Sequence, residues 1–226
     1  MGGPGAIRHE KSRGIPRRVR AKRPFRKTVL IVGEGRETEP NYFNGLTDED
    51  AVSTRFAVRV TGGPGFSPER VVKRAINLAK QAERRGDAFD EVWCVLDVEG
   101  PQTRESLGRA RQMAAEADIR LCLSNPSFEV WLLSHFVRRA RAYSGWEAVV
   151  ADLNKPWQAR FGRSYEKNDA RIYERLASLT QVAVKNARWV RETHHRAKPD
   201  TIACNSSTDV YQLVEHLTGP VASATK

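Results

Sequence analysis

Four carboxylates stand out because each follows a short apolar, β-branched run or opens the segment after one. Glu34 lies between two glycines, Asp97 and Glu99 follow a later run, and Glu129 follows a third. Uncompensated carboxylates in one place would repel each other and lose their charge. A divalent cation resolves that conflict, and Mg²⁺ prefers carboxylate oxygens while keeping waters for a substrate phosphate. We therefore interpret Asp97, Glu99 and Glu129 as candidate ligands of Mg²⁺ (or Mn²⁺) that could polarise a phosphodiester.

These residues need elements that bring them together, and strands alternate with helices in the first part of the chain. We expect strands at 27–32, 56–60, 91–96 and 119–123, with helices from about residue 39, from 67 to 86 and from 103 to 117. This alternation favours a parallel sheet with right-handed crossovers. Ligands bind beyond the carboxyl ends of the strands in such sheets, which is where the carboxylates lie.

The second part of the chain is predicted to be helical. We expect a long helix opened by Asn125 and Pro126, a helix at 146–153 capped by Ser144 with Glu147, a loop at 154–167, helices at 168–179 and 181–196, and a last helix after Asp209. The predicted fold class is therefore α/β, a parallel sheet flanked by helices with a helical C-terminal half. The expected division is a tail at 1–26, an α/β core at 27–143 and a helical extension at 144–226.

The positive charge is concentrated at the N-terminus. Residues 1–27 hold ten basic side chains against one acid, which is +9 of the total charge of +11. Glycine and proline are interspersed and apolar residues are few, so we expect a flexible polycation. Such a tail suits phosphate backbones through salt-dependent, sequence-independent contacts, although it could also be a solubilising extension. The tail residues expected to contact nucleic acid are Arg17, Arg18, Arg20, Lys22 and Arg23.

Composition excludes several classes of protein. No apolar run approaches the roughly 20 residues that span a bilayer, and the basic N-terminus has no signal-peptide core. The three cysteines, Cys94, Cys122 and Cys204, have no CxxC spacing and are interpreted as reduced core thiols. We expect a cytoplasmic protein without a membrane partner.

Longer motifs resemble those of a known family. They are VLIVGEG at 29–35 with ETEPNYF at 37–43, LSNPSFEVWLL at 123–133, Tyr165 with Lys167, and NSSTDV at 205–210. Together, from about residue 27 to residue 217, they are similar to the four signatures of RloB-like (AbiL-type) proteins.

The resemblance implies a toprim-like fold and a role in prokaryotic defence against phage, often beside a partner ATPase. By the toprim pattern, Glu34 would be the general acid/base, while Asp97 and the acid two positions later would hold magnesium. The chain departs from the family at two places. Glu99 replaces the usual second aspartate, which changes the reach of that ligand, and Ser206 replaces the usual proline of the fourth motif.

Four polar residues are candidates for substrate binding. Ser124 and Asn125 could bind a substrate phosphate or orient Glu129, or they could simply cap a helix. Tyr165 and Lys167 lie in a predicted loop where a phosphate contact is plausible.

The predicted function is that of a metal-dependent nuclease that hydrolyses nucleic-acid phosphodiesters. The alternative is a catalytically weak or inactive nucleic-acid-binding or adaptor subunit of a defence complex, with a site weakened by Glu99. Phosphoryl chemistry on a small molecule is less favoured, because phosphatases with an Asp-x-Asp motif carry it after the first strand. The sequence leaves RNA and DNA open as targets.

Overall fold

The computed structural model describes residues 26–195 and 201–219. The predicted basic tail therefore lies outside the described residues, except for Arg26, and so do its five predicted nucleic-acid contacts. In the described part of the chain, no helix is both long enough and apolar enough to cross a membrane.

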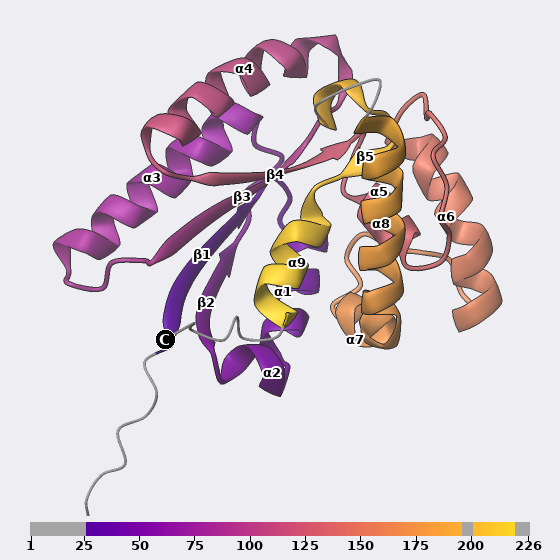
Figure 1. The fold of residues 1–226 in the computed structure, drawn as a ribbon, viewed down its shortest axis with the longest axis horizontal. Coiled ribbons are helices and arrows are strands. Elements are labelled where there is room, and N and C mark those ends of the chain that lie inside the picture. Colours follow the sequence, from indigo (N-terminus) through magenta and orange to yellow (C-terminus); the bar gives the residue numbers. More distant parts are fainter. Residues whose placement is uncertain (1–25, 196–200, 220–226) are drawn as a thin grey trace, which may run out of the picture.

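One sheet of five strands forms the centre of the molecule (Figure 1). Its strands are β1 (Lys27–Gly33), β2 (Phe56–Thr61), β3 (Glu91–Asp97), β4 (Arg120–Asn125) and β5 (Ser207–Thr208), and their order across the sheet is β2-β1-β3-β4-β5. The first four are parallel, as the alternating pattern predicts, whereas β5 pairs antiparallel with β4. This fifth strand was not predicted, because two residues are too short to show a strand period.

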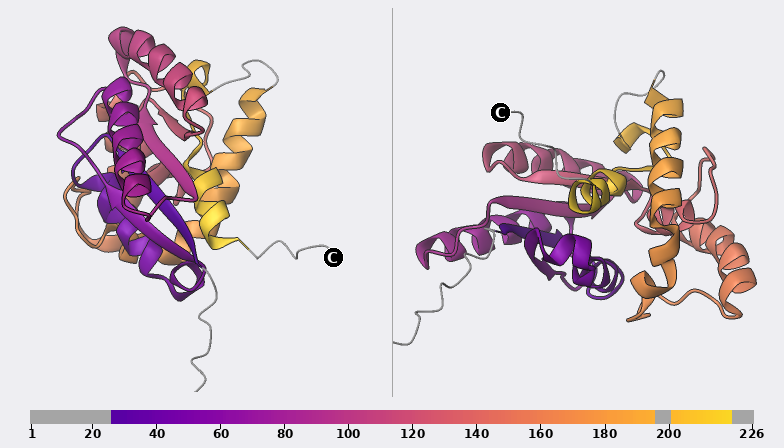
Figure 2. Two further views of the ribbon diagram at one scale, coloured as in Figure 1. Left: turned by 90° about the vertical axis from the view of Figure 1, so that its left-hand side faces the viewer. Right: turned by 60° about the horizontal axis from the view of Figure 1, so that its bottom comes forward.

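Helices cover both faces of the sheet (Figure 2). One face packs against α3 (Pro68–Arg84) and α4 (Gly100–Glu116). The other packs against α1 (Thr38–Asp48) and α9 (Val210–Thr218), with the short α2 (Asp50–Ser53) beside them. Successive residues of β1 alternate between these faces, Val29 and Ile31 toward α1 and Leu30 and Val32 toward α3. Both faces are apolar, so β1 reads as a continuous apolar run.

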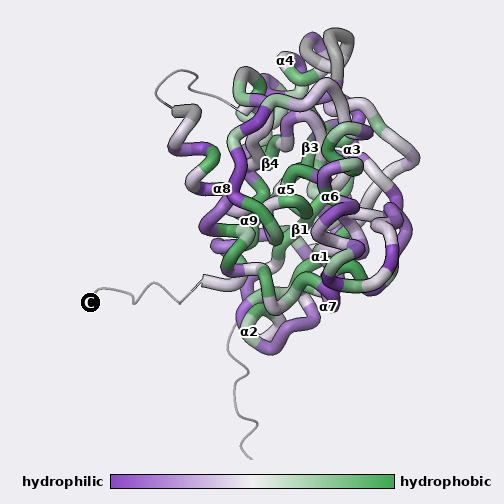
Figure 3. The backbone as a smooth tube through the Cα atoms, turned by 90° about the vertical axis from the view of Figure 1, so that its right-hand side faces the viewer, coloured by the Kyte–Doolittle hydropathy of each residue, from purple (hydrophilic) through white to green (hydrophobic). Residues whose placement is uncertain are grey.

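The remaining helices pack beyond α1 and α9. They are α5 (Glu129–Ser134), α6 (Trp146–Phe161), α7 (Ile172–Leu176) and α8 (Thr180–His195), with 3-10 turns at Ala177–Leu179 and Thr201–Ala203. Helix α5 contacts α6 and α8, while α7 contacts α1. All six residues of α5 are buried, and the helix lies near the middle of the molecule in the view of Figure 3. The helical C-terminal half is thus confirmed.

Two predicted helix boundaries were wrong. The helix after Asn125 is not long, since α5 has only six residues, and the side chain of Asn186 donates a hydrogen bond to the carbonyl of its last residue, Ser134. The helix that begins at Trp146 continues through Pro156 to Phe161, where a loop was expected. Its extra turns are held by Trp157, whose buried ring packs edge-on against Phe161. The expected cap by Ser144 is also absent, because Gly145 occupies the cap position and no side chain caps the helix.

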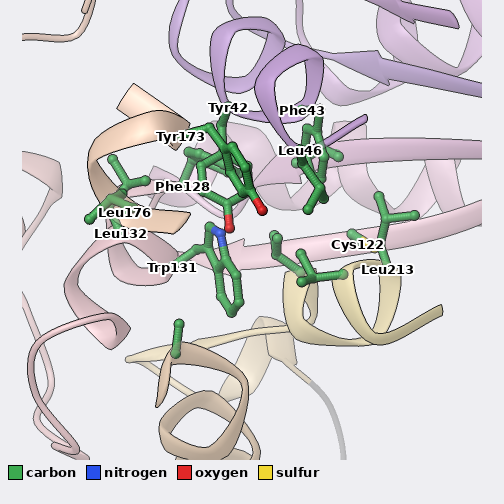
Figure 4. Packing of buried hydrophobic residues seen from close by; sticks show 14 of the residues in the cluster. Tyr42, Phe43, Leu46, Cys122, Phe128, Trp131, Leu132, Tyr173, Leu176 and Leu213 are labelled. Atoms are coloured by element: carbon green, nitrogen blue, oxygen red, sulfur yellow. The ribbon is translucent and has the colours of Figure 1, made fainter. Parts of the chain in front are cut away.

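An aromatic cluster fixes α1 against α5 (Figure 4). Tyr42 of α1 is fully buried and meets Phe128, Trp131 and Tyr173 at edge-to-face angles, with ring centroids 5.3 to 6.0 Å apart. Such pairs contribute about 0.5–1.5 kcal/mol each beyond area burial. This packing fixes where the segments that flank the cluster, around Glu39 and Glu129, can lie.

Candidate functional site

The strand order reverses between β1 and β3, and this places a crevice at their carboxyl ends. The chain leaves β1 into α1, whose Leu46 packs on one face, and leaves β3 into α4, whose Leu107 packs on the other. Helices that diverge to opposite faces leave an opening between the two strand ends, where ligands bind in open α/β sheets.

Glu34 and Asp97 meet at this opening. The backbone N–H of Asp97 donates a hydrogen bond of 3.1 Å to Oε1 of Glu34. Burial raises the pKa of Glu34 to about 8; the hydrogen bond from Asp97 opposes this shift, and repulsion from Glu39 and Glu99 adds to it. A carboxyl group with such a pKa can hold or release a proton near neutral pH.

Asp97 experiences the charge of every other carboxylate of the predicted set. Its pKa is raised well above the usual value by burial and then by repulsion from Glu34, Glu39, Glu129 and Glu99. Burial and then repulsion from Glu129 also raise the pKa of Glu99. The fold therefore brings the four predicted carboxylates close enough to interact electrostatically.

Glu39 is a fifth acid of the site, and the sequence interpretation missed it. Its side chain is buried, and Oε1 accepts a hydrogen bond of 3.1 Å from the backbone N–H of Gly35. Burial raises its pKa, with a smaller contribution from repulsion by Glu129. Glu39 looked like an ordinary first-turn acid before Pro40. The signal that could have identified it is its position in the first turn of the helix that follows Gly33-Glu34-Gly35, because that turn must begin beside the strand end.

Glu129 is held by three polar side chains. Ser127 Oγ donates a hydrogen bond of 2.6 Å to Oε2, and the buried Tyr165 hydroxyl donates one of 3.3 Å to Oε1. The Nζ atom of Lys167 lies 3.3 Å from the same Oε1 and 3.9 Å from the ring centroid of Trp146. Tyr165 thus orients an acid of the site, while Lys167, whose side chain is about half exposed, supplies a cation at its edge.

A pocket of about 430 Å³ opens onto these groups. Its lining includes Glu34, Glu39, Asp97 and Glu129 together with Arg36, Lys167 and the loop residues Pro64 and Gly65. Two larger pockets, of about 530 and 590 Å³, lie away from the carboxyl ends of the strands. One is lined by residues near the starts of β1 and β2, and the other lies between α1 and α7. The smaller pocket, which the acidic residues line, is therefore the candidate site.

Ser124 and Asn125, predicted as substrate contacts, are buried and bonded within the fold. The hydroxyl groups of Ser124 and Thr208 are hydrogen-bonded over 2.8 Å, which joins β4 to β5. The Nδ2 atom of Asn125 donates to the carbonyl oxygens of Thr201 and Ile202, at 3.1 and 2.9 Å. Neither residue lines the pocket. In this structure both side chains hold the C-terminal segment against the sheet, and neither faces the pocket.

The acidic set has the donor chemistry of a magnesium site. Its oxygens are those that Mg²⁺ prefers, and a bound cation would offset the repulsion and burial that raise the pKa values. Across residues 26–195 and 201–219, however, no three acidic, histidine or cysteine side chains form a ready-made ligand group. The residues thus fit a hard cation by charge and donor type, whereas their side chains would have to turn to chelate it.

Comparisons with known proteins bear on the family of the chain. A search of the curated proteins gives no match. The family model described as RloB-like protein matches residues 29–217, a range that contains all the described residues of the site. It also contains the four motifs on which the resemblance rested. The chain therefore belongs to the RloB-like family.

Proposed function

We propose that this protein is a metal-dependent, toprim-like nuclease of a prokaryotic phage-defence system of the abortive-infection kind. The observation that supports this best is the hydrogen bond between Asp97 and Glu34 at the crevice where the strand order reverses. It joins Glu34, which follows β1, to Asp97 at the end of β3, and this supports the roles that the toprim pattern implies for the two acids.

Five residues of the site have a defined task in this proposal: Glu34, Asp97, Glu99, Glu129 and Lys167. Asp97 and Glu99, with Glu129, would hold Mg²⁺ or Mn²⁺. The chemistry that such a cation supplies when bound is Lewis-acid polarisation of the phosphodiester. Glu34 takes the proton of the attacking water, as general base, and returns it to the departing oxygen. Lys167 stabilises negative charge that develops on the phosphate.

The test uses conservative amide variants and a mixed panel of substrates. Glu34→Gln and Asp97→Asn preserve side-chain size, and labelled tRNA, single-stranded DNA and duplex DNA are incubated with each protein in Mg²⁺, in Mn²⁺ and in EDTA. We expect cleavage by the wild type with metal, and a loss of about 100-fold or more in each variant. Glu116→Gln, at the exposed end of α4, is the matched control and should cleave like the wild type. Full cleavage by either pocket variant would remove the mechanism.

A nucleic-acid-binding subunit without nuclease activity is the second candidate. Two observations favour it: Glu99 replaces the usual aspartate, and the described acidic residues form no ready-made ligand group. Glu99→Asp separates the two candidates. Magnesium-dependent cleavage by this variant but not by the wild type would identify a site that has lost activity. Comparable cleavage by both would support the nuclease. A partner ATPase is proposed from the family setting and would be sought by co-purification.

A further inference from the structure

A glycine-rich loop lies directly on the turn that carries Glu34. The backbone N–H of Phe66 donates a hydrogen bond of 3.3 Å to the carbonyl oxygen of Glu34. A Cβ atom at Gly62 would lie only 1.8 Å from the carbonyl oxygen of Gly35, so only glycine permits this approach. Two residues of the same loop, Pro64 and Gly65, line the carboxylate pocket. A ligand that binds to this loop or to the helix after it would therefore lie next to Glu34.

Two arginines stack on the aromatic ring at the end of this loop. The guanidinium carbons of Arg70 and Arg74, one turn apart on α3, lie 5.1 and 5.8 Å from the ring centroid of Phe66. Such cation–π contacts place the charge over the face of the ring and do not use the N–H donors in hydrogen bonds. Most N–H donors therefore remain available, and among the described residues the only hydrogen bond of either guanidinium group is one of 3.4 Å from Arg74 to the Thr61 hydroxyl.

No carboxylate of the described residues neutralises the charge of this pair. Both arginines are exposed, and among the described residues neither guanidinium group lies within 4.0 Å of a carboxylate. The acid next to them in sequence, Glu69, is engaged by Lys73 and Arg109. A pair of oriented, uncompensated guanidinium groups thus lies beside a pocket of opposite charge.

We infer that Phe66, Arg70 and Arg74 form a phosphate clamp that binds the backbone of a nucleic-acid strand beside the carboxylate pocket. This inference rests on the proposed function and adds to it the path of the substrate. A polyanion that approaches five carboxylates is repelled, so neighbouring phosphates need cations close to the pocket. Guanidinium groups match phosphate oxygens with paired N–H donors, and the phenylalanine ring limits the rotamers that must be ordered on binding. The clamp contacts no base, so it binds strands of any sequence.

The experiment measures binding rather than cleavage. Full-length Asp97→Asn protein in EDTA is titrated with fluorescent single-stranded and duplex oligonucleotides at several salt concentrations. In this background, Arg70→Gln with Arg74→Gln is compared with Arg84→Gln plus Arg85→Gln. The control pair removes the same charge about 20 Å away, at the other end of the same 17-residue helix. The basic tail is present in both proteins, so its contribution cancels.

We expect the clamp variant to bind at least about 10-fold more weakly at physiological salt, and its salt slope to fall by about 1.4 for single strands or 1.8 for duplex. The control pair should change the affinity and the salt slope only by the small amount that a lower net charge causes. Phe66→Leu keeps both charges and should weaken binding by a smaller factor, because it removes only the ring that orients them.

Equal affinity and equal salt slope for the clamp variant and the control would overturn the inference. So would wild-type binding by Phe66→Leu, since the ring would then have no part in it. The proposed function fails in a different way. A wild type that binds through the clamp but cuts nothing with Mg²⁺ or Mn²⁺ rejects the nuclease and keeps the clamp. A wild type that cuts, together with a clamp variant that binds normally, rejects the clamp alone.

Discussion

The backbone N–H of Asp97 donates a hydrogen bond to Oε1 of Glu34 over 3.1 Å, and this bond joins the ends of two neighbouring parallel strands. It positions one oxygen of the acid that we propose as the general base. It also holds the Glu34 side chain against the backbone of Asp97, although burial and like charge raise the pKa of both carboxyl groups.

The raised pKa of Glu34 predicts how stability depends on pH in the metal-free protein. The folded pKa of about 8 exceeds the unfolded value of 4.5, so its contribution is full below pH 4.5 and is lost as pH rises through 8. Glu34→Gln has no carboxyl group to titrate at this position, so the variant does not lose this stability as pH rises. The Tm of the variant minus that of the wild type should therefore increase between pH 5 and pH 8.5, by at least about 2–4 °C. A difference that stays constant over this pH range would contradict the raised pKa of Glu34.

Metal binding should be visible without any activity. Because a ligand that binds only the folded state stabilises it by mass action, Mg²⁺ or Mn²⁺ should raise the Tm of the wild type with increasing concentration. Asp97→Asn removes a proposed ligand and should abolish most of the increase. Thermal scans with Mg²⁺, Mn²⁺ and EDTA make the measurement. If metal raises the Tm of Asp97→Asn as much as that of the wild type, the metal binds elsewhere.

Gly62 should be required for activity although it carries no functional group. Gly62→Ala places a Cβ atom 1.8 Å from the Gly35 carbonyl oxygen, so the loop or the Glu34 turn must move. We expect cleavage to fall about 100-fold, since small displacements of catalytic groups are costly. Gly108→Ala is the matched control, because nothing lies within 4 Å of a Cβ atom there and alanine favours the helix by up to about 1 kcal/mol. Equal activities would mean that the loop adjusts without moving Glu34.

Ser124 should affect stability and not catalysis. Its buried hydroxyl bonds to Thr208 across β4 and β5, and removal of such a bond costs about 1–3 kcal/mol. Ser124→Ala should lower the midpoint of urea unfolding while kcat in the cleavage assay stays unchanged. Thr193→Ala, on the exposed side of α8, removes a hydroxyl that donates to the Trp189 carbonyl of the same helix, and it should leave the midpoint nearly unchanged. Loss of cleavage at wild-type stability would instead return Ser124 to the substrate site.

Lys167 should set the pH range of activity. Its charge lowers the pKa values of Glu39 and Glu99, so Lys167→Met allows both to rise. The acid limb of the pH profile of kcat/KM should therefore move to higher pH, and cleavage at neutral pH should fall about 10-fold or more. Lys155→Met removes an exposed lysine that pairs with Asp152 and serves as the control. An unshifted profile would exclude an electrostatic role for Lys167.

The sequence determined the framework of the site. The apolar, β-branched runs that end at Gly33 and at Asp97 are typical of buried strands, and the helical patterns between them favoured parallel pairing. Because parallel strands place their carboxyl ends along one edge, the convergence of Glu34, Asp97 and Glu129 followed from local pattern alone. Even Glu99, two positions after Asp97, could be assigned to this edge.

Only the tertiary structure decided which polar side chains face the pocket. Ser124 and Asn125 end a parallel strand as Asp97 does, but β5 and the turn at Thr201–Ala203, some 80 residues later, cover them and take their hydrogen bonds. Glu39 and Phe66 belong to the site because they contact the Gly33-Glu34-Gly35 turn, and no periodic pattern of residues predicts these contacts. The spacing of apolar residues along a helix or strand shows which of its faces is apolar. Burial and hydrogen-bond partners depend on segments far apart in the chain, and only folding brings these together.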